Sequence, residues 1–242
     1  MVTGPRDGAL RDFIKIAGRR ETRCRLIVIA FHSRTIQFAN AGHAFSRIGV
    51  IADHIAQAHV AWERTEWGRI LLLFRHITTL QPRVLLFWDT AAWHMAWNAS
   101  VAAMNDRTQP RLALRVKAQR EYFALGKDFL ERGIKNNPDR PQLYEALARL
   151  YKEKYKDHQR ASELYAKAAA VPDAATFDRR FSAYELSYCE GREREAYERL
   201  RSLYDEGEQE RLPTLIARLK FLEDKLTIPQ DQRIPDKGPV GR

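Results

Sequence analysis

The chain has 242 residues, enough to bury a sizeable core, and a formal net charge of +10. Its apolar runs stay well short of the ~20 residues that a membrane-spanning helix needs, so no transmembrane segment is predicted. The two cysteines, Cys24 and Cys189, are far apart and lie in no CxxC motif, so neither a disulfide framework nor a zinc site is indicated.

The N-terminal end is basic. Residues 1–60 carry nine arginines and lysines against four acids, and this excess of five positive charges is half of the net charge of +10. We predict that residues 1–45 form a weakly ordered basic segment. Within it, LRDFIKIAGRR is compatible with a short amphipathic helix, and the β-branched residues of CRLIVIAFHSRTIQF favour a strand.

Two later stretches superimpose, TTLQPRVLLFWDTAAWHMAWN from Thr78 and IKNNPDRPQLYEALARLYKEK from Ile134. With Pro82 aligned to Pro138, similar residues pair: Phe87 with Leu143, Trp88 with Tyr144, Ala91 with Leu147, Ala92 with Ala148, and Met95 with Tyr151. Another proline, Pro172, follows Pro138 by 34 residues, and a helical pattern precedes each proline. Such a period, with paired helices, predicts an all-α helical solenoid.

The chain resembles the tetratricopeptide repeat (TPR) family. The best-matching unit keeps the family's aromatic and small positions as Tyr144, Leu147, Ala148, Tyr151, Ala161, Tyr165, Ala168 and Pro172. The preceding unit keeps them as Trp88, Ala91, Ala92, Met95, Gly126, Leu130, Gly133 and Pro138, with about 22 residues beyond the family period. The resemblance implies a right-handed superhelix of antiparallel helix pairs over residues 46–226.

The additional residues, 99–120, contain the turn signal NDRTQP. After it, Leu112, Val116, Phe123 and Leu130 fall on one helical face, so an over-long second helix is expected in this unit. A fourth copy places Ala196 and Leu200 at 35 residues from Ala161 and Tyr165.

The C-terminal end is expected to close the solenoid. Gly191 and Gly207 mark helix ends. A C-terminal capping helix is predicted near 209–226 from an apolar stripe of Leu212, Leu215, Ile216, Leu219 and Leu222. Three prolines follow among mixed charges, so residues 227–242 are predicted to be a disordered tail.

The stretch LLFWDTAAWHMAWN, residues 85–98, concentrates three tryptophans. On a regular helix Trp88, Ala91, Ala92 and Met95 share one face and occupy the packing positions of the family. Trp93 and Trp97 share the opposite face with Asp89, which in the family lines the concave peptide-binding groove. The competing interpretation is that residues 99–120 or the N-terminal region cover Trp93 and Trp97, which then belong to the core.

The corresponding groove positions of the next unit are Gln142, Glu145, Arg149, Lys152 and Glu153. The predicted partner-binding residues are Asp89, Trp93, Trp97, Gln142, Arg149 and Lys152. A groove with tryptophans at one end and cations at the other would suit a ligand that carries an apolar side chain beside an acidic group.

No catalytic or metal-binding motif is found. The seven histidines form no HExxH or HxxxH pair, and no glycine-rich phosphate loop or nucleophile elbow is present. His94 is expected to be an ordinary histidine of the helix. We therefore predict neither an enzyme nor a cofactor nor a metal.

The expected function is a protein-binding scaffold in the cytoplasm. One alternative is nucleic-acid or anionic-membrane binding by the basic N-terminal segment. A narrower resemblance, carried by ITTLQP and LLFWDTAAWHMAWNAS, is to uncharacterised bacterial TPR proteins that usually begin with a membrane anchor, absent from this sequence. It implies a second alternative, a structural subunit of an envelope or pilus assembly. The protein is expected to be envelope-associated instead of cytoplasmic if the start of the sequence is incomplete. The oligomeric state is not predicted.

Overall fold

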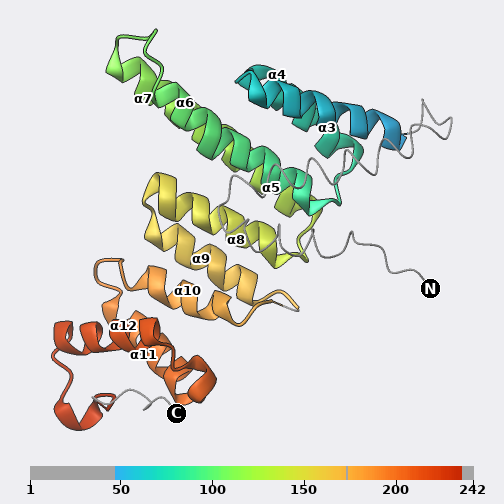
Figure 1. The fold of residues 1–242 in the computed structure, drawn as a ribbon. Helices are drawn as coiled ribbons and strands as arrows, with labels where there is room; N and C mark the ends of the chain where they lie inside the picture. The colour runs from blue at the N-terminus through green and yellow to red at the C-terminus, as the bar shows by residue number, and fades with distance from the viewer. Residues whose placement is uncertain (1–46, 173, 236–242) are drawn as a thin grey trace, which may run out of the picture.

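The computed structural model describes residues 47–172 and 174–235, which form helices and connecting loops without any strand (Figure 1). The all-helical class is therefore confirmed for this part of the chain. The basic segment 1–45 and its predicted strand lie outside the described residues. No helix in the described ranges is long and apolar enough to cross a membrane.

The N-terminal half consists of two antiparallel helix pairs of unequal length. The first pair is α3 (Arg47–Glu63) and α4 (Trp67–Leu80). In the second pair the first helix runs through α5 (Leu85–Trp93), a π-helical segment η1 (His94–Ala99) and α6 (Ser100–Met104). It returns as α7 (Leu112–Asn136), whose 25 residues confirm the predicted over-long helix.

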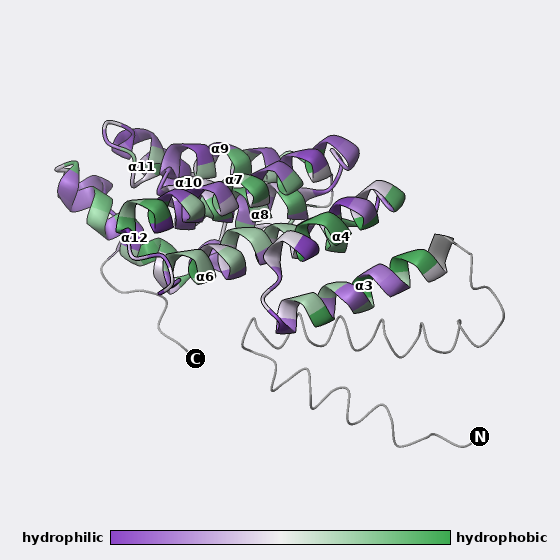
Figure 2. Cartoon of the chain, turned by 90° about the horizontal axis from the view of Figure 1, so that it is seen from above, coloured by the Kyte–Doolittle hydropathy of each residue, from purple (hydrophilic) through white to green (hydrophobic). Residues whose placement is uncertain are grey.

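The C-terminal half continues the stack, and each helix packs on the one before it (Figure 1). Its elements are α8 (Pro141–Leu150), the π-helical η2 (Tyr151–Tyr155), α9 (His158–Ala169), α10 (Phe177–Leu186), α11 (Glu193–Asp205), α12 (Pro213–Lys225) and two short 3₁₀ turns, η3 (Glu208–Glu210) and η4 (Gln230–Gln232). Viewed from above, α3 lies at one end of the molecule (Figure 2).

Local signals in the sequence account for several helix ends. Pro141 and Pro213 occupy the first turns of α8 and α12, where a missing N–H costs nothing. The Asp157 carboxylate caps α9 by accepting the backbone N–H of Arg160 at 2.9 Å. Gly191 and Gly207 have φ angles of +76° and +140°, so both predicted stops coincide with left-handed backbone.

The second and third helix pairs repeat one hydrogen bond. The Trp88 indole donates to the carbonyl of Pro82 at 2.9 Å, and the Tyr144 hydroxyl donates to the carbonyl of Pro138 at 3.2 Å. These are the pairs that the sequence alignment matched. Each aromatic ring thus ties its helix to the loop that precedes it.

Small residues lie where helices meet most closely. Ala92, Ala148 and Ala161 are at most 1% exposed. A methyl group at Gly126 would lie 2.6 Å from Cβ of Ala96, and one at Gly133 would lie 2.9 Å from the Trp88 ring. Any larger side chain at either glycine would push α7 away from α5 and η1.

A polar layer separates two apolar clusters, one within residues 51–150 and the other within 183–234. Helices α8 and α10 can be aligned by their buried alanines, Ala148 and Ala183. In this alignment Leu143 matches Asp178, Leu147 matches Ser182, and Leu150 matches Glu185. All six side chains are buried, so the face of α10 that meets α9 is polar where that of α8 is leucine-rich. The Ser162 hydroxyl donates to the Ser182 carbonyl at 2.8 Å across this junction.

Two expectations for the C-terminal end need correction. The capping helix begins at Pro213, so Leu212 precedes it and stays exposed, whereas Leu215, Leu219 and Leu222 are fully buried. The predicted disordered tail, residues 227–242, begins too early in the sequence. The prediction is wrong for residues 227–235. Prolines end the helix there, but Ile228 and Ile234 still pack on the leucine face, and the Ile234 N–H donates to Glu223 at 2.8 Å. Residues 236–242 lie outside the described part.

Candidate functional site

A hollow of about 290 Å³ opens between α8, η2, α9 and α10, and we call it the groove. It is lined by Glu145, Arg149, Lys152, Glu153, Tyr165, Phe177 and Phe181. Two of the predicted partner-binding residues, Arg149 and Lys152, therefore lie in its wall. The other four, Asp89, Trp93, Trp97 and Gln142, are not part of its lining; Asp89 and Gln142 are exposed.

Trp93 and Trp97 adjoin the groove through Glu153. Their rings stack with centroids 4.7 Å apart and an angle of 11° between the planes, and both are half-buried. The Trp97 indole donates to Oε2 of Glu153 at 3.0 Å, and Nζ of Lys154 lies 5.1 Å from the Trp97 ring. Trp97 also packs against the apolar cluster of the N-terminal half. It therefore combines the two interpretations, with one side in the core and its polar edge toward the groove.

The first helices of the second and third helix pairs each contain a π-helical segment at the same register. The alignment of Pro82 with Pro138 carries η1, residues 94–99, onto 150–155, which includes η2. A π turn inserts one residue, so the residues that follow are rotated by about 100° relative to a regular α-helix. This rotation was not predicted, because the sequence-based projection assumed a regular helix through Trp97.

The two predicted cations differ in their surroundings. Nζ of Lys152 lies 2.5 Å from Oε1 of the buried Glu185, whose other oxygen meets Nδ1 of His158 at 2.8 Å. Arg149 is half-buried, and within the described ranges no carboxylate comes within ion-pair distance of its guanidinium group. Lys152 therefore supports the junction with α10, whereas Arg149 keeps its donors available to a ligand.

Desolvation controls the electrostatics of the groove. Burial raises the pKa of Glu145, and Asp89 on the neighbouring helix adds to this effect, while Arg149 opposes it. Burial likewise raises the pKa of Tyr165 to about 12, so its phenol stays neutral. A charged group that enters here is only weakly screened by water, which strengthens its interaction with Arg149 or Glu145.

Phe177 and Phe181 of α10 form the opposite wall, and neither was predicted as a groove residue. Tyr184 and Tyr188 continue the same helical spacing outside the lining of the groove, where Tyr184 packs on the C-terminal cluster and Tyr188 lies against Arg218. The rings of Phe177 and Phe181 are 5.3 Å apart, and that of Tyr165 is 5.4 Å from Phe181. Phe181 is 37% exposed and Tyr188 57%. Their spacing at i, i+4, i+7 and i+11 was the signal that could have revealed this aromatic face.

His94 belongs to the core, not to a site. It is 6% exposed, and its ring nitrogen Nδ1 lies 3.2 Å from the Asn98 amide nitrogen. Burial, assisted by the nearby His59, lowers its pKa to about 4. The imidazole is therefore neutral at physiological pH and packs as a flat, largely apolar ring.

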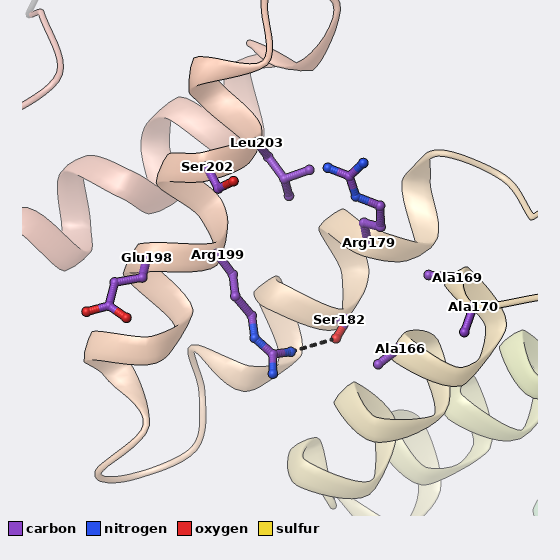
Figure 3. A pocket seen from close by; sticks show the side chains of 9 residues that line it. All are labelled: Ala166, Ala169, Ala170, Arg179, Ser182, Glu198, Arg199, Ser202 and Leu203. Carbon is purple, nitrogen blue, oxygen red and sulfur yellow. Dashed lines mark hydrogen bonds between the residues drawn. The ribbon is translucent and has the colours of Figure 1, made fainter.

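A larger hollow of about 600 Å³ lies between α9, α10 and α11 (Figure 3). Its floor includes Ala166, Ala169 and Ala170. Both of its guanidinium groups already have partners: Arg179 pairs with Glu206, and Arg199 donates to Glu195 at 2.7 Å and to Ser182 at 3.4 Å. Because these cations are paired, the hollow offers little specific chemistry, and the groove remains the better candidate.

In the described residues, no three His, Cys, Asp or Glu side chains are grouped so as to hold a metal ion. Comparison with known proteins adds no assignment: no protein-family model matches this chain, and no curated protein is significantly similar to it. The groove is therefore interpreted from its own geometry and charge.

Proposed function

We propose that this protein is a tetratricopeptide-like scaffold that binds an extended segment of a partner protein in the groove. In this proposal the helix pairs form a right-handed superhelix that α12 caps, with α5, α8 and α10 on its concave side. The repeated hydrogen bonds of Trp88 and Tyr144 and the buried alanines support the repeat assignment. A cytoplasmic location remains a prediction of the same kind.

The observation that carries the proposal is Arg149. Its guanidinium group is half-buried and forms no close ion pair in the described part of the chain, so only the longer-range attraction of Glu145 offsets the lost hydration. It lies in the same hollow as Phe177 and Phe181. A ligand segment with an apolar side chain next to an aspartate or glutamate would cover the rings and pair with Arg149.

The size of the groove also favours a peptide. About 290 Å³ is at the lower end of the range for small-molecule sites, which run from roughly 300 to 1,000 Å³. This volume suits one or two side chains of a longer segment rather than an enclosed cofactor. The proposal therefore assigns binding, without a catalytic step.

The test is affinity capture from the native cell with the whole protein and the variants Arg149→Glu and Trp93→Ala. Arg149→Glu reverses the charge that we expect to pair with the ligand. Because a buried arginine at an interface commonly contributes about 2 kcal/mol, affinity should fall at least about thirtyfold. Trp93→Ala removes the stacked ring beside the groove, and the same partners should weaken.

Arg194→Glu is the matched control, since Arg194 is exposed on α11 and outside the groove. Partners that are lost with Arg149→Glu but retained with Arg194→Glu support the proposal. An unchanged list of partners in both groove variants would reject it.

A further inference from the structure

The hairpin tip, residues 101–117, projects beyond the rest of the stack (Figure 1). It exists because both helices of this pair are longer than those of the next: α7 has 25 residues, whereas α9 has 12. Leu112 was expected on the buried face with Phe123 and Leu130, but it is 54% exposed. The apolar stripe of α7 thus extends beyond the neighbouring helices, which are too short to cover Leu112.

Apolar side chains are exposed on more than one side of the tip. Val101 on α6 is 48% exposed, and Leu114 is 42% exposed. Leu112 and Leu114 are two residues apart and so point about 200° away from each other around the helix axis. A partner protein lying along one helix face would cover only one of them, whereas a soft interface that receives the tip end-on would cover both.

The tip is also strongly basic. Residues 101–117 contain four arginines and lysines and one acid, Asp106. Arg107 and Arg111 are exposed, as is Arg120 one turn beyond the tip on α7, and no carboxylate of the described residues lies within ion-pair distance of them. Asp106 is engaged within the loop, because its Oδ1 accepts both the Thr108 N–H at 2.9 Å and the Thr108 hydroxyl at 2.7 Å.

We propose that the hairpin tip binds the surface of an anionic lipid bilayer. Its arginines meet the phosphates of the headgroups, and Val101, Leu112 and Leu114 enter the boundary with the acyl chains. This combination of exposed apolar side chains and cations is what interfacial binding requires. Nucleic acid matches the charge equally well but offers nothing to the exposed leucines, so the lipid surface is favoured.

The test is co-sedimentation of the whole protein with vesicles of phosphatidylcholine, alone or with one third phosphatidylglycerol. Binding is expected only to the anionic vesicles and should weaken as salt is added. The pair Arg107→Gln/Arg111→Gln should lower the partition coefficient roughly thirtyfold, from about 1 kcal/mol for each charge. The pair Leu112→Gln/Leu114→Gln should lower it about tenfold through lost apolar burial.

Matched controls distinguish the tip from the rest of the surface. Val60→Gln/Leu72→Gln removes two exposed apolar side chains from α3 and α4, and Arg64→Gln/Arg75→Gln removes two exposed charges from the same region. Both controls should bind like the unaltered protein, and all variants should keep its helical circular dichroism.

Three results would overturn the proposal. The first is no binding to anionic vesicles, or equal binding to neutral ones. The second is equal binding by the tip variants and their controls, which would place the contact elsewhere. The third is retention of a DNA duplex that depends on the tip arginines while the leucine pair leaves vesicle binding unchanged, which would identify the tip as a nucleic-acid surface.

Discussion

Trp97 donates a hydrogen bond to the residue that occupies its own position in the following helix pair. The alignment of Pro82 with Pro138 carries Trp97 onto Glu153, and the indole nitrogen lies 3.0 Å from Oε2 of that glutamate. Both residues lie in π-helical segments. The contact therefore joins equivalent points of two neighbouring pairs, at the edge of the groove.

This hydrogen bond should be measurable by a double-mutant cycle of Trp97→Phe and Glu153→Gln. The acceptor is charged but only half-buried, so a coupling free energy of about 1 kcal/mol is expected. Urea unfolding followed by circular dichroism, fitted at the step in which the N-terminal cluster unfolds, gives the four stabilities without relying on the tryptophan signal. A coupling indistinguishable from zero would mean that the contact adds no stability.

The close approach of α7 to η1 predicts a large effect from one methyl group. In Gly126→Ala the new Cβ would lie 2.6 Å from Cβ of Ala96 and 2.9 Å from the carbonyl of Ala92, so the backbones must separate. We expect a loss of about 1–3 kcal/mol, although alanine is the better helix former. Gly68→Ala is the control, since nothing lies within 4 Å of its Cβ, and it should be neutral or stabilising. Equal stabilities of the two variants would contradict this packing.

The polar junction between α9 and α10 predicts two unfolding steps. All five tryptophans lie between residues 62 and 97, so their fluorescence reports only on the N-terminal apolar cluster. Circular dichroism reports on every helix. Because the C-terminal cluster is smaller and meets its neighbour through a polar layer, helicity should begin to fall at lower urea than fluorescence. Superimposable curves would show one cooperative unit.

Asp178 should make stability depend on pH. Burial is the main cause that raises its pKa to about 7, Glu145 adds to it, and the backbone N–H of Ala175 opposes it. The folded protein holds this proton more tightly than the unfolded chain, so the stabilisation is complete below about pH 4 and is lost as the pH rises through 7.

Asp178→Asn should remove that dependence. Between about pH 5 and pH 8 the unaltered protein should lose up to about 3 kcal/mol more stability than the variant, since the raised pKa lies about two units above the start of this range and each unit corresponds to about 1.4 kcal/mol. Urea midpoints across this range provide the measurement. Parallel pH profiles of the two proteins would show that Asp178 titrates normally.

The sequence predicted the features that depend on local pattern. Proline spacing located the helix pairs, and small residues such as Ala92, Ala148 and Gly126 identified the close contacts, because only small side chains fit there. The long helix at 112–136 followed from its apolar spacing.

Other features depend on tertiary contacts that no single segment encodes. The π turns at 94–99 and 151–155 replace one set of backbone hydrogen bonds by another and have no composition signal. The burial of Ile234 requires the leucine face of α12, which is distant from the prolines that suggested disorder. The polar junction at Asp178 appears only when equivalent positions are compared in space.

Site-specific photocrosslinking in the native cell tests the central claim, that a partner lies in the groove. A photoreactive phenylalanine analogue at Phe181 places the probe in the groove, and one at Glu198 places it in the hollow between α9, α10 and α11. We predict an adduct of defined mass from position 181 that Arg149→Glu abolishes, and none from position 198. Adducts from 198 alone, or equally from both positions, would contradict the account.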